Sequence, residues 1–260
     1  MPKKTSLDTI RQLLVTHGQK ASRMELVLAQ LSNNILQHQL KTKRGPIKVI
    51  SLMASVYQGE LLPFFSGIVS LIIRKLKEND EDLHESLSEA TGGLIQFGLK
   101  DATEDVACEN LKTTLTKLFQ LCGTGHRHTQ KGASMCVVKA IQNISPFHLP
   151  MLLNEICTNL FKLLRSSNCK NHFQLLESVL NVLIVYQGHP RRLEENARLL
   201  IPVIYANLHH KEGHVRKMAI EVMSTISHLL PEVTAPYKEE LLKKLNLSRY
   251  NVVILNLSLG

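Results

Sequence analysis

The stretch Leu199–Pro231, LLIPVIYANLHHKEGHVRKMAIEVMSTISHLLP, decides the fold because it holds two apolar helical stripes joined by a short, polar and basic loop. In each stripe the apolar side chains recur at spacings of three and four residues, which is the period of a helix with one apolar face. The stripes consist of Leu200, Val203, Ile204 and Leu208, and of Val215, Met218, Ala219, Val222, Met223 and Ile226. One helix pair cannot bury both apolar faces by itself, so the stretch predicts similar pairs stacked on either side.

The composition of the chain agrees with stacked helices. Of 260 residues, 44% are hydrophobic, which is enough to bury a large core. Aromatic residues make up only 5% and Trp is absent, which favours helix stacks over a β-sandwich. The formal charge is 31 − 22 = +9, so we expect acidic partners, whether acidic protein, nucleic acid or anionic membrane.

Polar loops recur along the chain at a regular interval. They are centred near residues 44, 80, 126, 168 and 212, at intervals close to the HEAT and armadillo repeat length of ~40–47 residues. The sequence therefore predicts an all-α solenoid of HEAT/armadillo type with about five to six helix pairs and no β-sheet. We expect one domain over residues 1–260, with capping helices in 1–45, central repeats in 46–235 and an incomplete last repeat in 236–260.

The apolar stripes also place the individual helices. At the start of the chain we expect two capping helical patterns within about 6–39, followed by a helix with the stripe Val49, Ile50, Met53 and Val56. Between this helix and the pair in 199–231 we expect three further pairs, over 62–77 with 83–99, 103–121 with 130–144, and 149–164 with 170–186. A further helix is expected over 236–245.

Cysteines and apolar windows indicate an intracellular protein. The five cysteines stand at irregular spacing, and we expect reduced thiols inside the helix stack; they are Cys108, Cys122, Cys136, Cys157 and Cys169. No window reaches the ~18 apolar residues of a membrane span, and the N-terminus lacks a signal-peptide pattern. We therefore expect no membrane span and a cytoplasmic or nuclear location.

No motif indicates catalysis. The segment 123–134, GTGHRHTQKGAS, is superficially similar to a phosphate-binding loop, but Lys131 is followed by Gly132 instead of Ser or Thr. His126, His128 and Cys136 lack the further ligands that a zinc site needs. We expect a helix–helix connection here, and neither an enzyme nor a cofactor or metal site.

The loops within the helix pairs line up along one edge of such a stack, so charge on them matters most for a partner. One interpretation is that these are ordinary solvated charges, and the alternative is a discontinuous cationic ridge that binds a partner. An acidic loop at 78–82 interrupts the series. The residues of the predicted ridge are Lys43, Arg44, Lys48, Arg127, Lys131, Lys170, Lys211, Arg216 and Lys217.

Several fragments carry a family resemblance. Residues 213–219, GHVRKMA, resemble the start of the second helix of a HEAT repeat. From about residue 43 to 250 the chain resembles the N-terminal region of the TORTIFOLIA1/SPIRAL2 family, whose repeats are TOG-like. The fragments that carry this likeness in order are GPIK at 45–48, LIIRKLK at 71–77, SEAT at 88–91, QKGASMC at 130–136, VRKMAI at 215–220 and PYK at 236–238.

The resemblance implies a non-enzymatic module that binds microtubules, with the basic loops on the acidic tubulin surface and the protein on the cytoskeleton. Actin and other acidic proteins are alternative partners. A general interaction scaffold, of the adaptor, transport-receptor or actin and nuclear-envelope type, is the alternative function. Nucleic acid is not expected, because the basic residues are not interleaved with aromatic ones.

Overall fold

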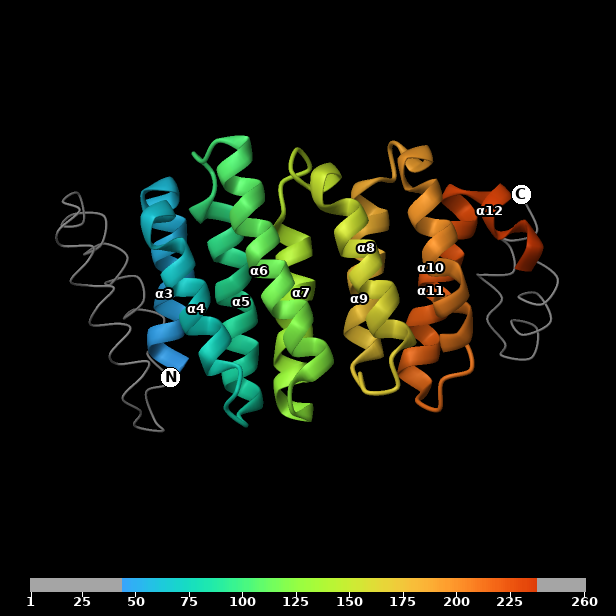
Figure 1. The fold of residues 1–260 in the computed structure, drawn as a ribbon, viewed down its shortest axis with the longest axis horizontal. Coiled ribbons are helices and arrows are strands. Elements are labelled where there is room, and N and C mark those ends of the chain that lie inside the picture. The colour runs from blue at the N-terminus through green and yellow to red at the C-terminus, as the bar shows by residue number, and fades with distance from the viewer. Residues whose placement is uncertain (1–43, 238–260) are drawn as a thin grey trace. The chain divides into compact units, whose positions relative to one another are not determined.

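Antiparallel helices make up the structure, a computed structural model that describes residues 44–237 (Figure 1). No residue in this range lies in a β-strand, which confirms the predicted all-α class. The capping helices expected in 1–45 lie outside the described residues apart from 44 and 45. The helix expected over 236–245 also lies outside them, except that 236 and 237 belong to a short 3-10 turn, η3 (Ala235–Tyr237).

The chain divides into two compact units, residues 1–148 (unit 1) and 149–260 (unit 2), and each is described by itself. The expectation of one continuous domain stays a prediction. The helices described in unit 1 are α3 (Arg44–Tyr57), η1 (Gln58–Phe64), α4 (Phe65–Lys75), α5 (Glu81–Gly98), α6 (Glu104–Thr124) and α7 (Arg127–Asn143).

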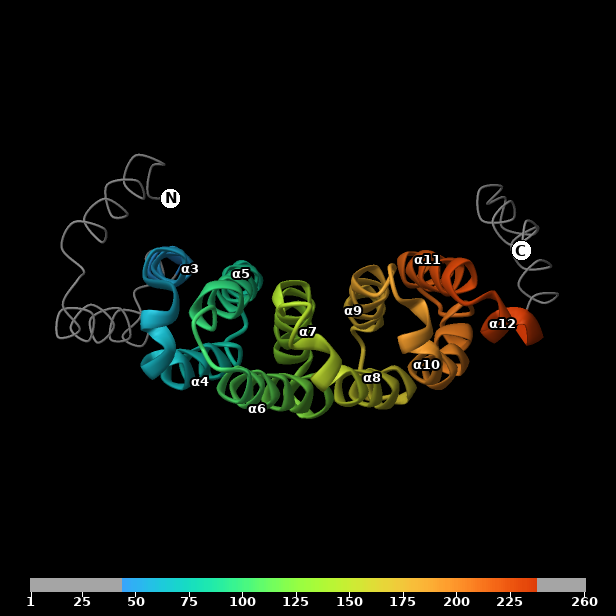
Figure 2. The same ribbon diagram turned by 90° about the horizontal axis from the view of Figure 1, so that it is seen from above.

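Unit 1 has two layers. Helix α5 packs between α3 and α7 in one layer, and α4 and α6 form the other (Figure 2). The neighbours approach closely because α5 carries small residues on its flanks: a Cβ atom built on Gly93 would lie only 3.4 Å from the Cα atom of Ser51 on α3. The α4–α5 and α6–α7 pairs are thus the repeats that the sequence predicted, with their loops at the same end of the unit.

The turn between α3 and α4 divides an apolar segment. Residues Ile50–Lys75 are long and apolar enough to cross a membrane by length and composition alone, contrary to the sequence-based expectation that no such window exists. In the structure this segment is split among α3, η1 and α4, and Gln58 adopts a left-handed backbone with φ 48° at the break. Its apolar side chains, such as Met53, Leu61 and Phe65, are buried in the core of unit 1.

Unit 2 repeats the two-layer arrangement. Helices α9 and α11 pack side by side, as do α8 and α10 (Figure 2). Its elements are α8 (Leu149–Arg165), α9 (His172–Val185), η2 (Pro190–Leu193), α10 (Glu194–Asn207), α11 (Gly213–Leu229), α12 (Pro231–Thr234) and η3.

The cysteines behave as core residues. Four of the five are buried, Cys108 is half-buried, and all five are free thiols. Burial raises the pKa of Cys136 and of Cys157 to about 12, which keeps these thiols protonated and unreactive.

Candidate functional site

The basic loops of unit 2 meet at one end of that unit. We call residues 165–172 and 208–217 the unit 2 loop edge; they comprise the α8–α9 and α10–α11 loops with the adjoining helix ends. Five cations and one carboxylate, Glu212, lie in these two ranges, so the formal charge is 5 − 1 = +4. The five cations, all with exposed side chains, are Arg165, Lys170, Lys211, Arg216 and Lys217.

Ring contacts hold the two loops of this edge together. The rings of His172 and His210 lie 5.2 Å apart, and Phe173 contacts His214 with ring centres 5.6 Å apart. The Nδ1 atom of His172 lies 2.6 Å from the Oδ1 atom of Asn207 at the end of α10. Burial, followed by the neighbouring His172, lowers the pKa of His210, so this ring stays neutral to lower pH than a free histidine. The cations are therefore presented on a packed base.

The cations of the unit 2 loop edge are not equivalent. Arg216 Nη1 donates hydrogen bonds to the carbonyl oxygens of His210, at 2.7 Å, and Lys211, at 2.9 Å, so this side chain also shapes its own loop. Lys170 Nζ donates to the carbonyl oxygen of Ser167 in its loop. Lys211 and Lys217 are exposed lysines of the α10–α11 connection that can reach a partner, as is Arg165 at the end of α8.

The equivalent loops of unit 1 carry no net charge. We call residues 75–82 and 126–131 the unit 1 loop edge; it holds four cations and four carboxylates. The predicted ridge residue Lys131 forms an ion pair with Glu81 at 2.7 Å, and the buried Lys75 pairs with Glu78 at 2.6 Å. The other ridge residue here, Arg127, is exposed at the start of α7. Among the predicted ridge residues whose side chains the structure describes, four lie in unit 2 and two, Arg127 and Lys131, lie in unit 1, where the surrounding carboxylates balance them.

The structure does not describe the side chains of the first three predicted ridge residues. Lys43 lies outside the described residues. Arg44 and Lys48 fall in the first turns of α3, and their side chains are outside the description.

Sequence reasoning missed the histidines and Arg165. Arg165 is the last residue of α8, His172 and His214 stand in the first turns of α9 and α11, and His210 lies in the α10–α11 loop itself. The predicted ridge counted only lysines and arginines of the loops, so it left these residues out. Extending each predicted loop by one helical turn would have found Arg165, and counting histidines as well as cations would have found the rings. No local sequence pattern could have predicted the Glu81–Lys131 ion pair, because the two residues are 50 positions apart and belong to different repeats.

The segment 123–134 is a helix–helix connection, as expected. Only Gly125 and His126 lie between α6 and α7, because both helices extend further into the segment than the stripes predicted. The ring of His126 stacks on that of His128, with centres 5.9 Å apart. Between residues 44 and 237, His, Cys, Asp and Glu side chains form no group of three or more that could hold a metal ion.

Comparison with models of known protein families shows to which family this chain belongs. The family model described as TORTIFOLIA1 N-terminal matches residues 4–254. The chain belongs to this family. Among its curated relatives from Arabidopsis thaliana, the microtubule-associated protein TORTIFOLIA1 is 23% identical over 189 residues, which are 71% of this chain and 21% of the relative.

A second Arabidopsis thaliana relative extends the match along the chain. TORTIFOLIA1-like protein 1 is 21% identical over 252 residues, or 95% of this chain and 30% of that protein. The chain thus spans about a fifth to a third of the length of the curated family members it matches.

Solved structures with the same fold are HEAT and armadillo solenoids. Kap121p superposes with a TM-score of 0.60 at 13% identity, over 95% of this chain and 30% of Kap121p. A designed armadillo repeat protein in complex with the peptide (KR)4 superposes with a TM-score of 0.53 at 16% identity, over 88% of this chain and 95% of that one. These likenesses show the fold alone, and they confirm the predicted solenoid class.

Proposed function

We propose that this chain is a non-enzymatic microtubule-binding module whose basic intra-repeat loops dock on the acidic surface of tubulin to organise or stabilise microtubules. Two observations support the proposal. The chain belongs to the TORTIFOLIA1 N-terminal family, of which one relative carries the name of a microtubule-associated protein. The single structural observation behind the docking surface is the net charge of +4, from five cations and one carboxylate, at the unit 2 loop edge.

The proposed contact is electrostatic. Exposed cations gathered on one edge attract an acidic partner over about a Debye length, ~8 Å at physiological salt, and accelerate its association. Each exposed ion pair adds only about 0.2–1 kcal/mol, so several must form together. A packed base under the cations limits the entropy lost when they do. The protein would then reside on the cytoplasmic microtubule cytoskeleton.

The test is co-sedimentation of the full chain with microtubules. We expect Lys211→Gln with Lys217→Gln to weaken binding by about three- to tenfold, as for the loss of two exposed ion pairs. The matched control is Arg191→Gln with Arg192→Gln, because these exposed arginines of η2 lie at the other end of unit 2 and carry the same formal charge. Arg216 is left intact because it bonds its own loop.

Two results would overturn the proposal. One is an equal loss of affinity in the two folded double variants, which would leave only general attraction to a basic chain. The other is stronger co-sedimentation with F-actin than with microtubules when both filaments are tested side by side at one salt concentration.

A further inference from the structure

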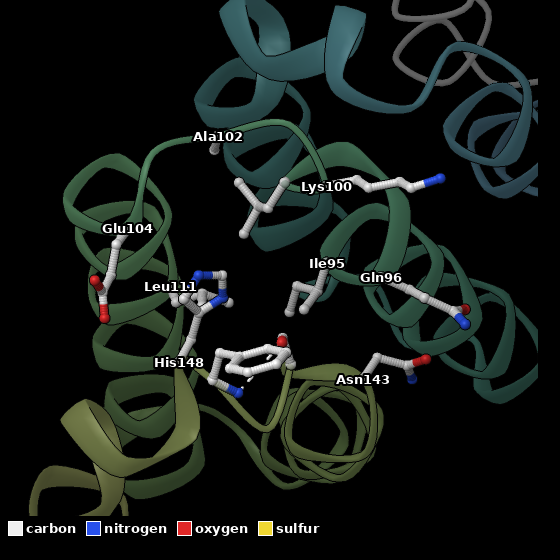
Figure 3. Close-up of a pocket in the computed structure, with 11 residues that line it drawn as sticks. Ile95, Gln96, Lys100, Ala102, Glu104, Leu111, Asn143 and His148 are labelled. Atoms are coloured by element: carbon white, nitrogen blue, oxygen red, sulfur yellow. Dashed lines mark hydrogen bonds between the residues drawn. The ribbon is translucent and has the colours of Figure 1, made fainter.

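A pocket opens at the end of unit 1 opposite its loop edge. It encloses about 550 Å³ between the C-terminal end of α5, the N-terminal half of α6 and the segment after α7. In Figure 3 Ile95, Leu111 and His148 face the central space, whereas Lys100, Gln96 and Asn143 extend away from it. A volume of this size, within the roughly 300–1,000 Å³ typical of ligand pockets, holds one or two large side chains.

The interior of the pocket is apolar. Ile95, Leu99 and Leu111 form it and are at most 4% exposed. Phe147 also lines the pocket, yet it is 84% exposed, the highest value among the large apolar side chains of residues 44–237. A short turn fixes the backbone at Phe147, since its N–H donates to Ser145 Oγ at 3.3 Å and the N–H of His148 donates to the Ser145 carbonyl at 2.9 Å. An exposed aromatic ring beside an apolar pocket presents apolar surface to water. Covering this surface with another apolar side chain is favourable in free energy.

The chain segments at this end of unit 1 carry mostly negative charge, and of their charged residues Glu104 and Lys100 line the pocket itself. The elements that meet at this end of unit 1 span residues 57–64, 96–106 and 142–148, and they carry four carboxylates and one ammonium, a formal charge of 1 − 4 = −3. That ammonium, of Lys100, donates a hydrogen bond to Gln58 Oε1 at 3.0 Å. The C-terminal ends of α5 and α7 add negative potential from their carbonyl groups, and the N-terminal end of α6, which begins at Glu104, adds positive potential that this carboxylate offsets. The four carboxylates are Glu60, Asp101, Glu104 and Asp105.

We propose that this pocket is a second docking site, which takes a cationic peptide segment of a partner protein by burying one large apolar side chain of the segment against Phe147. The apolar interior requires an anchor such as Leu, Met or Phe. The surrounding carboxylates require Lys or Arg on either side of that anchor and reject an acidic segment. The site is distinct in place and in charge from the unit 2 loop edge, so the chain can join an acidic surface to a basic partner.

Selection from a phage-displayed library of random dodecapeptides tests the proposal on the full chain. Phe147→Ser serves as the counter-selection target, because an exposed side chain can be truncated without unfolding the unit. We expect enriched peptides with a net positive charge around one large apolar residue. Enrichment of acidic peptides, or no enrichment over the Phe147→Ser protein, would overturn the proposal.

Fluorescence polarisation with a labelled enriched peptide measures how much Phe147 and the nearby carboxylates contribute to its affinity. Phe147→Ser should weaken binding by about tenfold or more, which corresponds to the burial of one large apolar side chain. Glu104→Gln with Asp105→Asn should weaken it about threefold and reduce its salt dependence. Glu81→Gln with Glu85→Gln is the control of equal charge at the loop end of unit 1 and should leave affinity unchanged. Equal affinity in all three variants would refute the site.

Two further measurements exclude other occupants. Sedimentation velocity should show the same oligomeric state for the wild type and Phe147→Ser. If the wild type self-associates and the substitution abolishes this, a second copy of the chain occupies the pocket and the proposal is overturned. Microtubule co-sedimentation should be unchanged in Phe147→Ser, and a loss there would contradict two separate sites. The pocket can therefore fail its test while the proposed function stands, and the reverse also holds.

Discussion

In the described part of unit 1, His84 is the buried residue with the least satisfied polar atoms. Its side chain is 1% exposed, and neither ring nitrogen has a partner in good hydrogen-bond geometry, although backbone groups of Glu78 and Leu76 lie close to the ring. Burial lowers the pKa of His84, and the ring of His128, 6.4 Å away, lowers it further, while backbone groups of Glu78 and Leu76 and the carboxylate of Asp80 act in the opposite direction. The folded protein therefore holds this histidine in its neutral form.

Acidification should destabilise the protein through His84. Below the usual histidine value of about 6.5 the unfolded chain binds a proton that the folded chain does not, so stability falls as pH drops through that value. Thermal unfolding between about pH 7.5 and 5.5 should show this loss, and it should be smaller in His84→Leu. The same loss in both proteins would mean that His84 does not contribute.

Gly132 is the reason that α7 can lie so close to His84. A Cβ atom at this position would come within 2.7 Å of the imidazole Cγ of His84 and within 2.9 Å of a methyl group of Leu76. Gly132→Ala should therefore lower the free energy of unfolding by about 1–3 kcal/mol, the cost of overpacking a core. Urea denaturation measures the change.

The control for this substitution is Gly67→Ala on α4. No atom lies within 4 Å of a Cβ atom built there, so the variant should be neutral or more stable by up to about 1 kcal/mol, since alanine favours a helix. A loss at Gly67 as large as at Gly132 would contradict the packing explanation.

At the scale of elements, the sequence predicted the helix pairs well and their ends less well. The apolar stripes placed α8 and α9 within two residues of their observed ends, because each has a wide buried face. The 3-10 helices η1 and η2 were not predicted, since elements of seven and four residues are too short to show a clear apolar period. The α6–α7 loop is shorter than expected because helical backbone bonds hold residues 123 and 124, and Thr124 Oγ1 also bonds the carbonyl of Gln120 at 2.8 Å.

Two ion pairs join α5 to α7, and only one lies at the loop edge. Glu81 pairs with Lys131 there, and Glu89 pairs with Lys139 two turns away, each at 2.7 Å. The hydrogen bond from Lys131 lowers the pKa of the Glu81 carboxyl group, which keeps it ionised and the edge neutral. Removing the Glu81 carboxylate would expose an unpaired cation at this edge.

Glu81→Gln should therefore strengthen microtubule co-sedimentation by about two- to threefold, which corresponds to one exposed charge. The free energy of unfolding should change by less than about 1 kcal/mol, because the pair is exposed. Glu89→Gln is the matched control: it breaks an equivalent pair away from the edge and should leave binding unchanged. Equal effects of the two substitutions would exclude the unit 1 loop edge from the contact.

For the whole molecule, the sequence predicted which loops carry basic residues. It did not predict in which of these loops the positive charge is neutralised by carboxylates of a neighbouring repeat. Local order along the chain was enough to predict the four helix pairs from α4–α5 to α10–α11 and to place Lys211 and Arg216 at the same helix connection. The neutralisation of Lys131 depends on α5 and α7 lying side by side, and the joining of two loops through His172 depends on unit 2 packing. Such pairings between repeats leave no local pattern in the sequence. The structure was therefore needed to choose the unit 2 loop edge from among the predicted ridge residues.

The last prediction separates docking from general attraction to a chain of net charge +9. Raising salt from about 50 to 200 mM shortens the reach of all exposed charges, so microtubule binding should weaken in the wild type. Lys211→Gln with Lys217→Gln should flatten this salt dependence more than Arg191→Gln with Arg192→Gln, although each pair removes the same charge, because short-range pairs at a contact are worth more than distant charges. Excess duplex DNA, a polyanion without the tubulin surface, should displace little of the wild-type protein from microtubules. Full displacement by DNA, with identical salt dependence in both folded double variants, would show that total charge alone accounts for the binding.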